Sequence, residues 1–149
     1  MNIWLMKSEP DEFSIDDLQK RKKEPWTGVR NYQARNYMKA AKLNDIVLFY
    51  HSNCAEPGIV GIARVSKVAF TDATQFDSKS DYYDAKSDQQ NPRWSCIEVS
   101  FVEKFKQVVT LPQLRENKKL RNLLILRPGN RLSVTPVEMS DYLEIKKLA

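Results

Sequence analysis

The sequence is poor in the residues that build metal centres, disulfide frameworks and nucleotide-binding loops. Its 149 residues include one histidine, two cysteines and four glycines. The single His51 cannot form a multi-histidine metal site, and Cys54 and Cys96 have no CxxC or Cys/His spacing. We therefore expect no cofactor, no bound metal and two free thiols in a reducing compartment.

Long apolar runs and enzyme motifs are also absent. The N-terminal apolar run, residues 3–6, is followed by acidic residues where a signal peptide would have its cleavage site. No run approaches the roughly eighteen apolar residues that cross a bilayer. No GxxxxGK(S/T), GxGxxG, GxSxG or HExxH motif occurs. The sequence thus predicts a protein with no membrane partner and no assignable catalytic residue. We expect it to be cytoplasmic or, in a eukaryote, nuclear.

The residues that are present suffice for one globular domain. Hydrophobic residues make up 42% of the chain and charged residues 29%, with 24 Lys and Arg against 19 Asp and Glu. A chain of this length buries about 70% of the surface of its unfolded form. No linker or repeat divides it, so we expect a single domain over residues 1–149, and a monomer. The net charge of +5 favours polyanionic partners without indicating a fold.

Hydrophobic patterning predicts strands interleaved with short helices. Strands are expected at residues 3–6, 45–50, 58–70, 93–105 and 131–137. Helices are expected at residues 14–22, 31–42, from 110, and 141–148 with Ser140 as the cap. Gly61 inside the third strand predicts a bulge, a bend or a close backbone approach. Because strands do not alternate with full-length helices, the predicted class is α+β, a small mixed β-barrel of five or six strands flanked by short helices.

Basic residues are concentrated in two stretches. Residues 20–42 contain eight Lys and Arg against one acid, and residues 101–131 contain eight against two. Residues 71–92 carry five aspartates and are expected to form a long surface loop. This segregation permits a basic face for a phosphate backbone, although solvated helix faces are the alternative and are preferred for the 20–23 run alone. The first stretch also contains residues that read base edges and stack on bases.

Six sequence strings resemble the EVE-domain family. They are WLMKSEPDEFS, WTGVRNYQARNYM, DIVLFYHS, GIVGIARV, PRW and RLSVTPV, and they occur in order over almost the whole chain. The resemblance implies a PUA-like fold, a compact β-barrel with flanking helices. It also implies binding without turnover: a modified nucleobase of DNA or RNA, such as 5-methylcytosine or 5-hydroxymethylcytosine, would be flipped into an aromatic and polar pocket.

The resemblance also implies which residues of this sequence form the site. The expected pocket residues are Ser8, Glu9, Trp26, Arg30, Asn31, Tyr50, His51, Ser52, Trp94, Arg131 and Ser133. The expected phosphate contacts are Lys20, Arg21, Lys22, Lys23 and Arg35, with Arg30 in support. Trp26 is the aromatic residue we expect in the pocket, whereas for Trp94 a pocket and a core position stay equally open. The nucleic acid is expected on the rim opposite the 71–92 loop, whose aspartates would repel a backbone.

Two other classes of function stay open. The same barrel could carry an enzyme of nucleoside or small-molecule chemistry with Glu9 or His51 as acid or base, or with a Cys/His pair. It could also be a small-ligand or protein-interaction module whose basic face is incidental.

Overall fold

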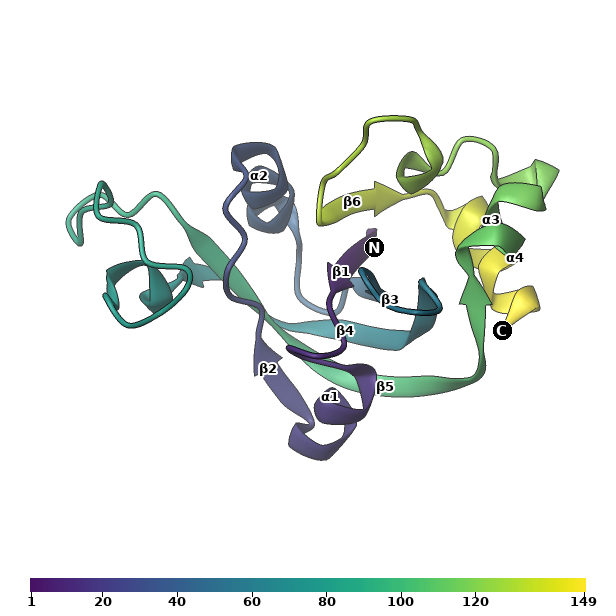
Figure 1. Ribbon diagram of the computed structural model, residues 1–149, viewed down its shortest axis with the longest axis horizontal. Helices are drawn as coiled ribbons and strands as arrows, with labels where there is room; N and C mark the ends of the chain where they lie inside the picture. Colours follow the sequence, from purple (N-terminus) through teal and green to yellow (C-terminus); the bar gives the residue numbers. More distant parts are fainter.

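The computed structural model describes residues 1–149 and contains one six-stranded mixed sheet. Its order is β2-β5-β4-β3-β1-β6 (Figure 1). The strands are β1 (Ile3–Ser8), β2 (Lys23–Pro25), β3 (Ile46–His51), β4 (Gly58–Thr71), β5 (Ser95–Thr110) and β6 (Val134–Val137). The helices are α1 (Ile15–Arg21), α2 (Tyr32–Ala40), α3 (Leu111–Glu116) and α4 (Met139–Leu148), with the 3-10 turns η1 (Ala73–Phe76), η2 (Lys118–Leu120) and η3 (Leu124–Leu126).

The sheet curves strongly but does not close into the expected barrel. Strands β1 and β3 pair in parallel and all other neighbours are antiparallel. The edge strands β2 and β6 do not pair with each other. Both are short and each contains a proline, Pro25 or Pro136, which has no backbone N–H to donate to another strand. The α+β class and the strand number are therefore confirmed, and the closed barrel is corrected to an open, curved sheet.

Most predicted elements are present, with informative differences. The register between β4 and β5 shifts at Gly61, as expected for a bulge. Strand β2 was not predicted, because its residues 23–25 begin at the last lysine of the 20–23 run and carry no strand pattern. The expected Ser140 cap is wrong: α4 begins at Met139, so Ser140 lies inside its first turn, and Glu138 is the N-cap.

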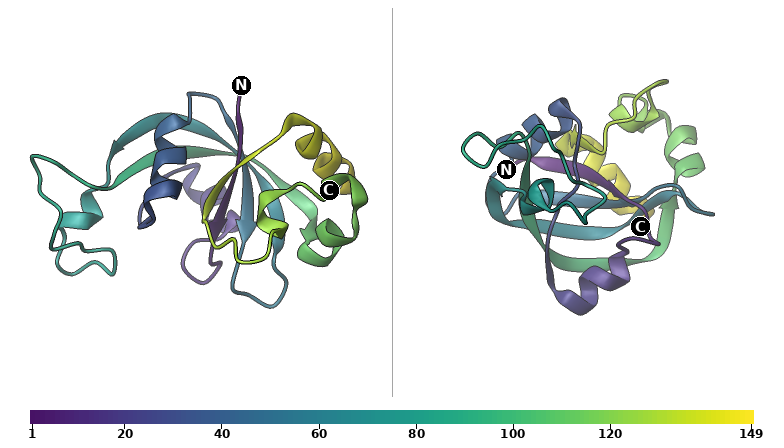
Figure 2. Two further views of the ribbon diagram at one scale, coloured as in Figure 1. Left: turned by 90° about the horizontal axis from the view of Figure 1, so that it is seen from above. Right: turned by 60° about the vertical axis from the view of Figure 1, so that its left-hand side comes forward.

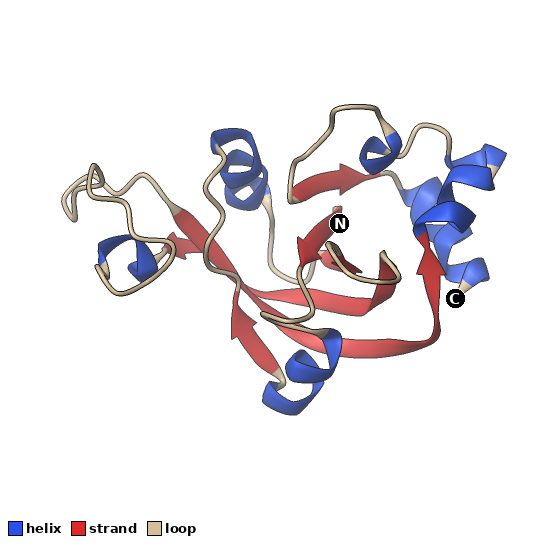
Figure 3. Ribbon diagram, in the orientation of Figure 1, coloured by secondary structure: helices blue, strands red, loops and turns tan.

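Two apolar clusters pack on opposite faces of the sheet. The helices that flank the curved sheet are seen in Figures 2 and 3. One contains Trp4, Trp26 and Phe49 and is covered by the apolar residues of α1 and α2. The other contains Tyr50 and is covered by α3 and α4. Successive residues of β3 therefore face different clusters, as alternation along a strand requires. No helix is long and apolar enough to cross a membrane.

Candidate functional site

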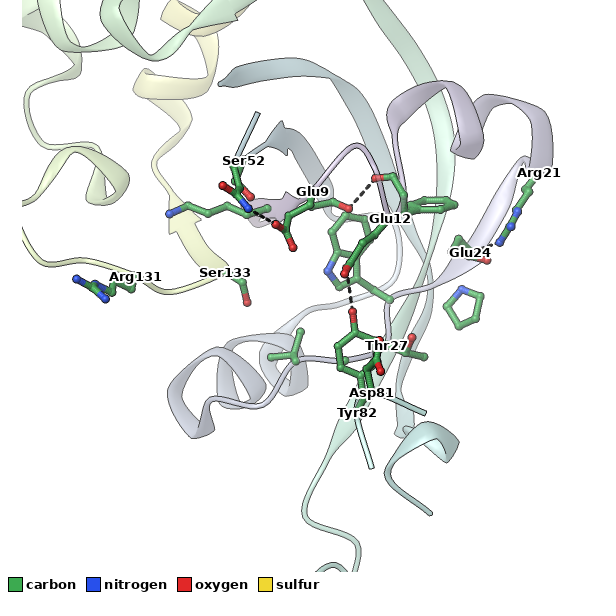
Figure 4. A pocket seen from close by; sticks show the side chains of 18 residues that line it. Glu9, Glu12, Arg21, Glu24, Thr27, Ser52, Asp81, Tyr82, Arg131 and Ser133 are labelled. Atoms are coloured by element: carbon green, nitrogen blue, oxygen red, sulfur yellow. Dashed lines mark hydrogen bonds and ion pairs between the residues drawn. The ribbon is translucent and has the colours of Figure 1, made fainter. Parts of the chain in front are cut away.

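One cavity of about 610 Å³ opens at the end of the sheet where β1 and β3 stop. Segments distant in sequence form its wall (Figure 4). They are the end of β1 and the turn after it, residues 21–29, the β3–β4 turn, residues 81–82 and residues 131–133. Of the expected pocket residues, the cavity brings together Ser8, Glu9, Trp26, Ser52, Arg131 and Ser133.

Trp26 is held rigidly in this wall. Its side chain is 7% exposed and its ring packs edge-on against Phe49 at 5.2 Å and against Phe13 at 6.5 Å. Its backbone N–H donates to the Ile97 carbonyl at 2.7 Å. The indole N–H has no partner within the protein, and Thr135 Oγ1 is the only buried side-chain polar atom without one. The Trp26 donor is therefore open to the cavity.

The turn after β1 places two carboxylates on the wall. The Glu9 carbonyl accepts the N–H groups of Glu12 at 3.0 Å and Phe13 at 2.9 Å, which folds the chain back toward α1. One carboxylate oxygen of Glu9, Oε1, accepts a hydrogen bond from the Asn53 side-chain amide. Glu12 Oε2 accepts from the Tyr82 hydroxyl at 3.1 Å. Each carboxylate thus has one oxygen committed to the protein.

Tyr82 brings the acidic 71–92 segment to the cavity. Its ring lies against the backbone of Gly28, where a Cβ would come within 2.6 Å of the ring. Gly28 has φ +88°, so a glycine is needed for both conformation and space. Burial and the hydrogen bond to Glu12 raise the pKa of Tyr82. Asp81 and Tyr82 of this segment form part of the wall, and the placement of the nucleic acid on the opposite rim stays a prediction.

The charges around the cavity are mixed. Four carboxylates and three cations line it: Glu9, Glu12, Glu24, Asp81, Lys7, Arg21 and Arg131. Arg21 is paired with Glu24 at 2.8 Å, whereas Lys7 and Arg131 form no salt bridge. Burial lowers the pKa of Lys7. The wall therefore offers acceptors and unpaired donors side by side, which suits a ligand with both kinds of polar edge.

Trp94 lies outside the cavity, in a separate cluster of aromatic and charged side chains. Its ring stacks on Tyr32 at 4.8 Å, and its indole N–H donates to Asp84 at 2.8 Å. Arg35 lies over the Tyr32 ring at 4.8 Å and donates to the Arg93 carbonyl at 2.8 Å. With 6% of its surface exposed, Trp94 holds the end of the 71–94 segment in place. Neither Trp94 nor Arg35 lines the cavity, so the expected pocket role of Trp94 and the expected phosphate contact of Arg35 stay predictions that their positions do not support.

Arg30 also points away from the cavity. Its guanidinium donates to Asp72, Thr74 and the Tyr82 carbonyl at 3.0 to 3.1 Å. Burial alone would raise the pKa of Asp72, but hydrogen bonds from Thr74, Gly28 and Arg30 hold it below its usual value. Arg30 therefore ties the acidic segment to the chain beside the cavity, and its donors are already used.

Three further expected pocket residues have structural partners. Asn31 is the N-cap of α2 and accepts from the Ala34 N–H at 3.0 Å. Tyr50 is 4% exposed in the second apolar cluster, and burial raises its pKa. His51 Nε2 accepts from the Ile15 N–H at 3.1 Å at the start of α1, and burial lowers its pKa. None of the three lines the cavity.

The expected phosphate contacts in residues 20–23 are dispersed. Arg21 alone lines the cavity, and its guanidinium is paired. Lys20 is exposed on α1, Lys22 is the C-cap of that helix at φ 70° and Lys23 begins β2. Their direct contact with a ligand in the cavity is not supported by their positions.

The structure contains no cluster of metal ligands, and both of its thiols are free. No group of three or more His, Cys, Asp and Glu side chains could hold a metal ion. Cys54 and Cys96 are free, and burial raises the pKa of Cys96 to about 12, which makes that thiol unreactive.

Sequence reasoning missed several wall residues. Lys7, Glu12, Phe13, Asn53 and Tyr82 line the cavity and were not expected there. Lys7 and Glu12 lie within the same WLMKSEPDEFS string as Ser8 and Glu9, so a complete transfer of that string would have found them. Tyr82 offered only the signal of an aromatic residue in a polar segment.

Comparison with known proteins identifies the family of the chain. The EVE domain family model matches residues 2–148. The chain belongs to the EVE domain family. The relatives of this EVE domain include thymocyte nuclear protein 1 from Rattus norvegicus, 40% identical over 159 residues, which cover 95% of this chain and 70% of that protein.

Two solved structures show the same architecture as this EVE domain. A protein from Pseudomonas syringae is 46% identical with a TM-score of 0.96, covering 98% of each chain. The human THYN1 protein, solved in complex with 5-methylcytosine-containing DNA, is 37% identical with a TM-score of 0.95, covering 99% of this chain and 97% of that one. The open curved sheet with its flanking helices is thus the EVE form of the PUA-like fold, as the sequence resemblance implied.

Proposed function

We propose that this EVE domain is a nucleic-acid-binding module that holds a modified cytosine, such as 5-methylcytosine or 5-hydroxymethylcytosine, in the 610 Å³ cavity. The observation that carries the proposal is a mainly polar cavity with Phe13, Trp26 and Tyr82 in its wall, in a chain whose relative, human THYN1, was solved with 5-methylcytosine-containing DNA. Binding without turnover is part of the proposal. His51, one of the two residues considered as an acid or base, is bonded to α1 and does not line the cavity.

The cavity supplies what a flipped base requires. Extruding a base from the stack costs a few kcal/mol, which stacking and edge contacts must recover. The Trp26 ring lines the cavity with 7% of the residue exposed, and base–aromatic stacking contributes about 1–3 kcal/mol where a base contacts it. The free donors of Trp26 and Lys7 and the acceptors of Glu9 and Glu12 face the same space. A single methyl group adds only about 1–3 kcal/mol of discrimination, so we expect modest selectivity for modified over plain cytosine.

The charges of the rim favour one side for the phosphate backbone. Arg131 is exposed and unpaired at one side of the cavity, whereas Asp81 and Tyr82 lie at another (Figure 4). An anionic backbone is attracted to the first side and repelled by the second. We therefore propose that the backbone passes Arg131, with Lys7 facing the nucleotide within the cavity, and that the 20–23 run contributes only long-range attraction.

The test is a titration of three duplexes that differ only in one central cytosine, which is plain, 5-methylated or 5-hydroxymethylated. Fluorescence anisotropy at several salt concentrations should give dissociation constants that rise with salt and are smallest for a modified base. The same oligonucleotide set as RNA distinguishes the two polymers. Absence of salt-dependent binding to every oligonucleotide would overturn the proposal. Sedimentation of the free protein tests the expected monomer.

A further inference from the structure

Glu9 is a wall residue with one carboxylate oxygen bonded to the protein and the other free. Its Oε1 accepts from the Asn53 amide, while its Oε2 has no partner in the protein. Figure 4 shows the carboxylate projecting into the cavity between Ser133 and Glu12. The bond to Asn53 and the turn after β1 fix its direction, so the free oxygen is a positioned acceptor.

A carboxylate oxygen distinguishes between pyrimidines at one atom. Cytosine carries a 4-amino group, which donates, next to N3, which accepts. Thymine carries O4, which accepts, next to a protonated N3. An ionised carboxylate can only accept a hydrogen bond, so it attracts the amino group of cytosine and repels the O4 of thymine. The 5-methyl group is common to thymine and 5-methylcytosine and cannot separate the two.

We propose that Glu9 is the residue that selects cytosine over thymine, by accepting a hydrogen bond from the 4-amino group at Oε2. The inference rests on the proposed function, because it assigns a role within the same base-binding cavity. Lys7 and Trp26 also line the cavity, and neither side-chain donor has an acceptor in the protein, so both are available to the acceptors N3 and O2. The Lys7 ammonium lies 5.9 Å from the centre of the Tyr50 ring. Selection of the modification at C5 is a separate matter that falls to other wall atoms.

Glu12 is the other carboxylate near this position, and its geometry favours it less. Its Oε2 accepts a hydrogen bond from the Tyr82 hydroxyl, and Glu12 is an exposed residue. Glu9 is half-buried, so its carboxylate is more strongly desolvated when a base enters. Hydrogen bonds to charged groups are worth more when water is excluded.

The test uses duplexes in which 5-methylcytosine or thymine lies opposite an abasic site, so that neither base has a pairing partner to lose. We expect the native protein to bind the 5-methylcytosine duplex at least about tenfold more tightly. Glu9→Gln should reduce this ratio to less than about threefold and should bind the thymine duplex more tightly than the native protein does. The side-chain amide of glutamine can present either its oxygen or its nitrogen, so it accommodates both bases.

A second ligand isolates the amino group without changing the protein. 5-Methylpyrimidin-2-one keeps the methyl group, N3 and O2 and lacks only the 4-amino group. The native protein should bind this base about tenfold more weakly than 5-methylcytosine, and Glu9→Gln should show a smaller difference between the two. This measurement on the native protein stands even if the variant folds poorly.

Asp11→Asn is the matched control, since Asp11 is an exposed carboxylate in the same turn that does not line the cavity. It should keep the native ratio. If the native protein binds 5-methylcytosine but the ratio survives in Glu9→Gln, or collapses only in Glu12→Gln, the assignment to Glu9 is wrong and the proposed function stands. If the native protein binds neither duplex, the proposed function fails and the assignment fails with it.

Discussion

Two regions of this EVE domain contain the same kinds of side chain and differ in what those side chains leave unpaired. In the cavity, Trp26 has a free indole N–H and Arg131 has no salt bridge. In the cluster at the base of the 71–94 segment, Trp94 donates to Asp84 and Arg30 is bonded to Asp72. Both regions hold tryptophan, arginine and carboxylate, yet only the first offers open hydrogen-bonding groups to a ligand.

The difference teaches that residue type alone does not identify a binding site. A polar group that already has internal partners must lose them before it can bind a ligand, and that loss costs about as much as the new bond gains. The cluster around Trp94 therefore stabilises the fold, and the cavity around Trp26 is suited to recognition. Substitutions in the two regions should separate stability from affinity.

The largest expected effect is on stability, from Arg30→Met. The change leaves the Asp72 carboxylate, whose side chain is 0% exposed, without its cationic partner. Breaking a buried ion pair costs about 3–5 kcal/mol, and the 22% exposure of the Arg30 side chain places the loss near the lower end. Urea denaturation measures the change in free energy of unfolding. Arg35→Met, which breaks no salt bridge, should cost less, and equal losses in the two variants would contradict the role of Arg30.

Trp26→Leu should weaken binding of the 5-methylcytosine duplex by about 1–3 kcal/mol, or about five- to 150-fold, because the stacking surface is removed. Trp94→Leu is the matched control, since the two tryptophans are 7% and 6% exposed. Both variants should lose stability, but Trp94→Leu should keep the native affinity at temperatures where it is folded. A loss of affinity in Trp94→Leu alone would mean that the base binds in the region around Trp94 and not in the cavity.

Arg131→Ala should weaken binding several-fold and reduce the slope of log affinity against log salt by about one. Its stability should be unchanged, because the side chain is exposed and unpaired. Lys23→Ala removes the same charge from an exposed position on β2 and should leave the slope nearly native. Equal changes of slope in the two variants would indicate a backbone path that our account does not include.

The smallest effect concerns pH and His51. Burial lowers the pKa of His51 below its ordinary value of 6.5, and Nε2 must stay unprotonated to accept the Ile15 N–H. The unfolded chain therefore binds more protons, so stability is complete above pH 6.5 and falls as the pH drops through the lower pKa of the folded state. Because the chain has one histidine, His51→Gln should flatten the dependence of the unfolding midpoint between pH 7.5 and 5.5. An unchanged pH profile would contradict this.

Much of the fold and part of the candidate site could be predicted from the sequence. Continuous apolar runs predicted β1, β3 and β4, and a cap residue predicted α1, because those patterns are local. The open edges of the sheet depend on pairing between distant strands, which no local pattern reports. The place of Trp26 in the cavity could be predicted from the family string that contains it. The hydrogen-bond partner of Arg30 lies more than forty residues away in the sequence, and that of Trp94 lies ten residues away. Long-range pairing of this kind decides which polar groups stay free.

The most direct measurement of the central claim is a proton–nitrogen NMR titration that follows the three indole N–H signals. Trp4 donates to Asp45 and Trp94 to Asp84, whereas the Trp26 donor is open to the cavity. On addition of the 5-methylcytosine duplex, the Trp26 signal should shift most and the other two should stay close to their free positions. A shift of the Trp94 signal with an unmoved Trp26 signal would contradict the account.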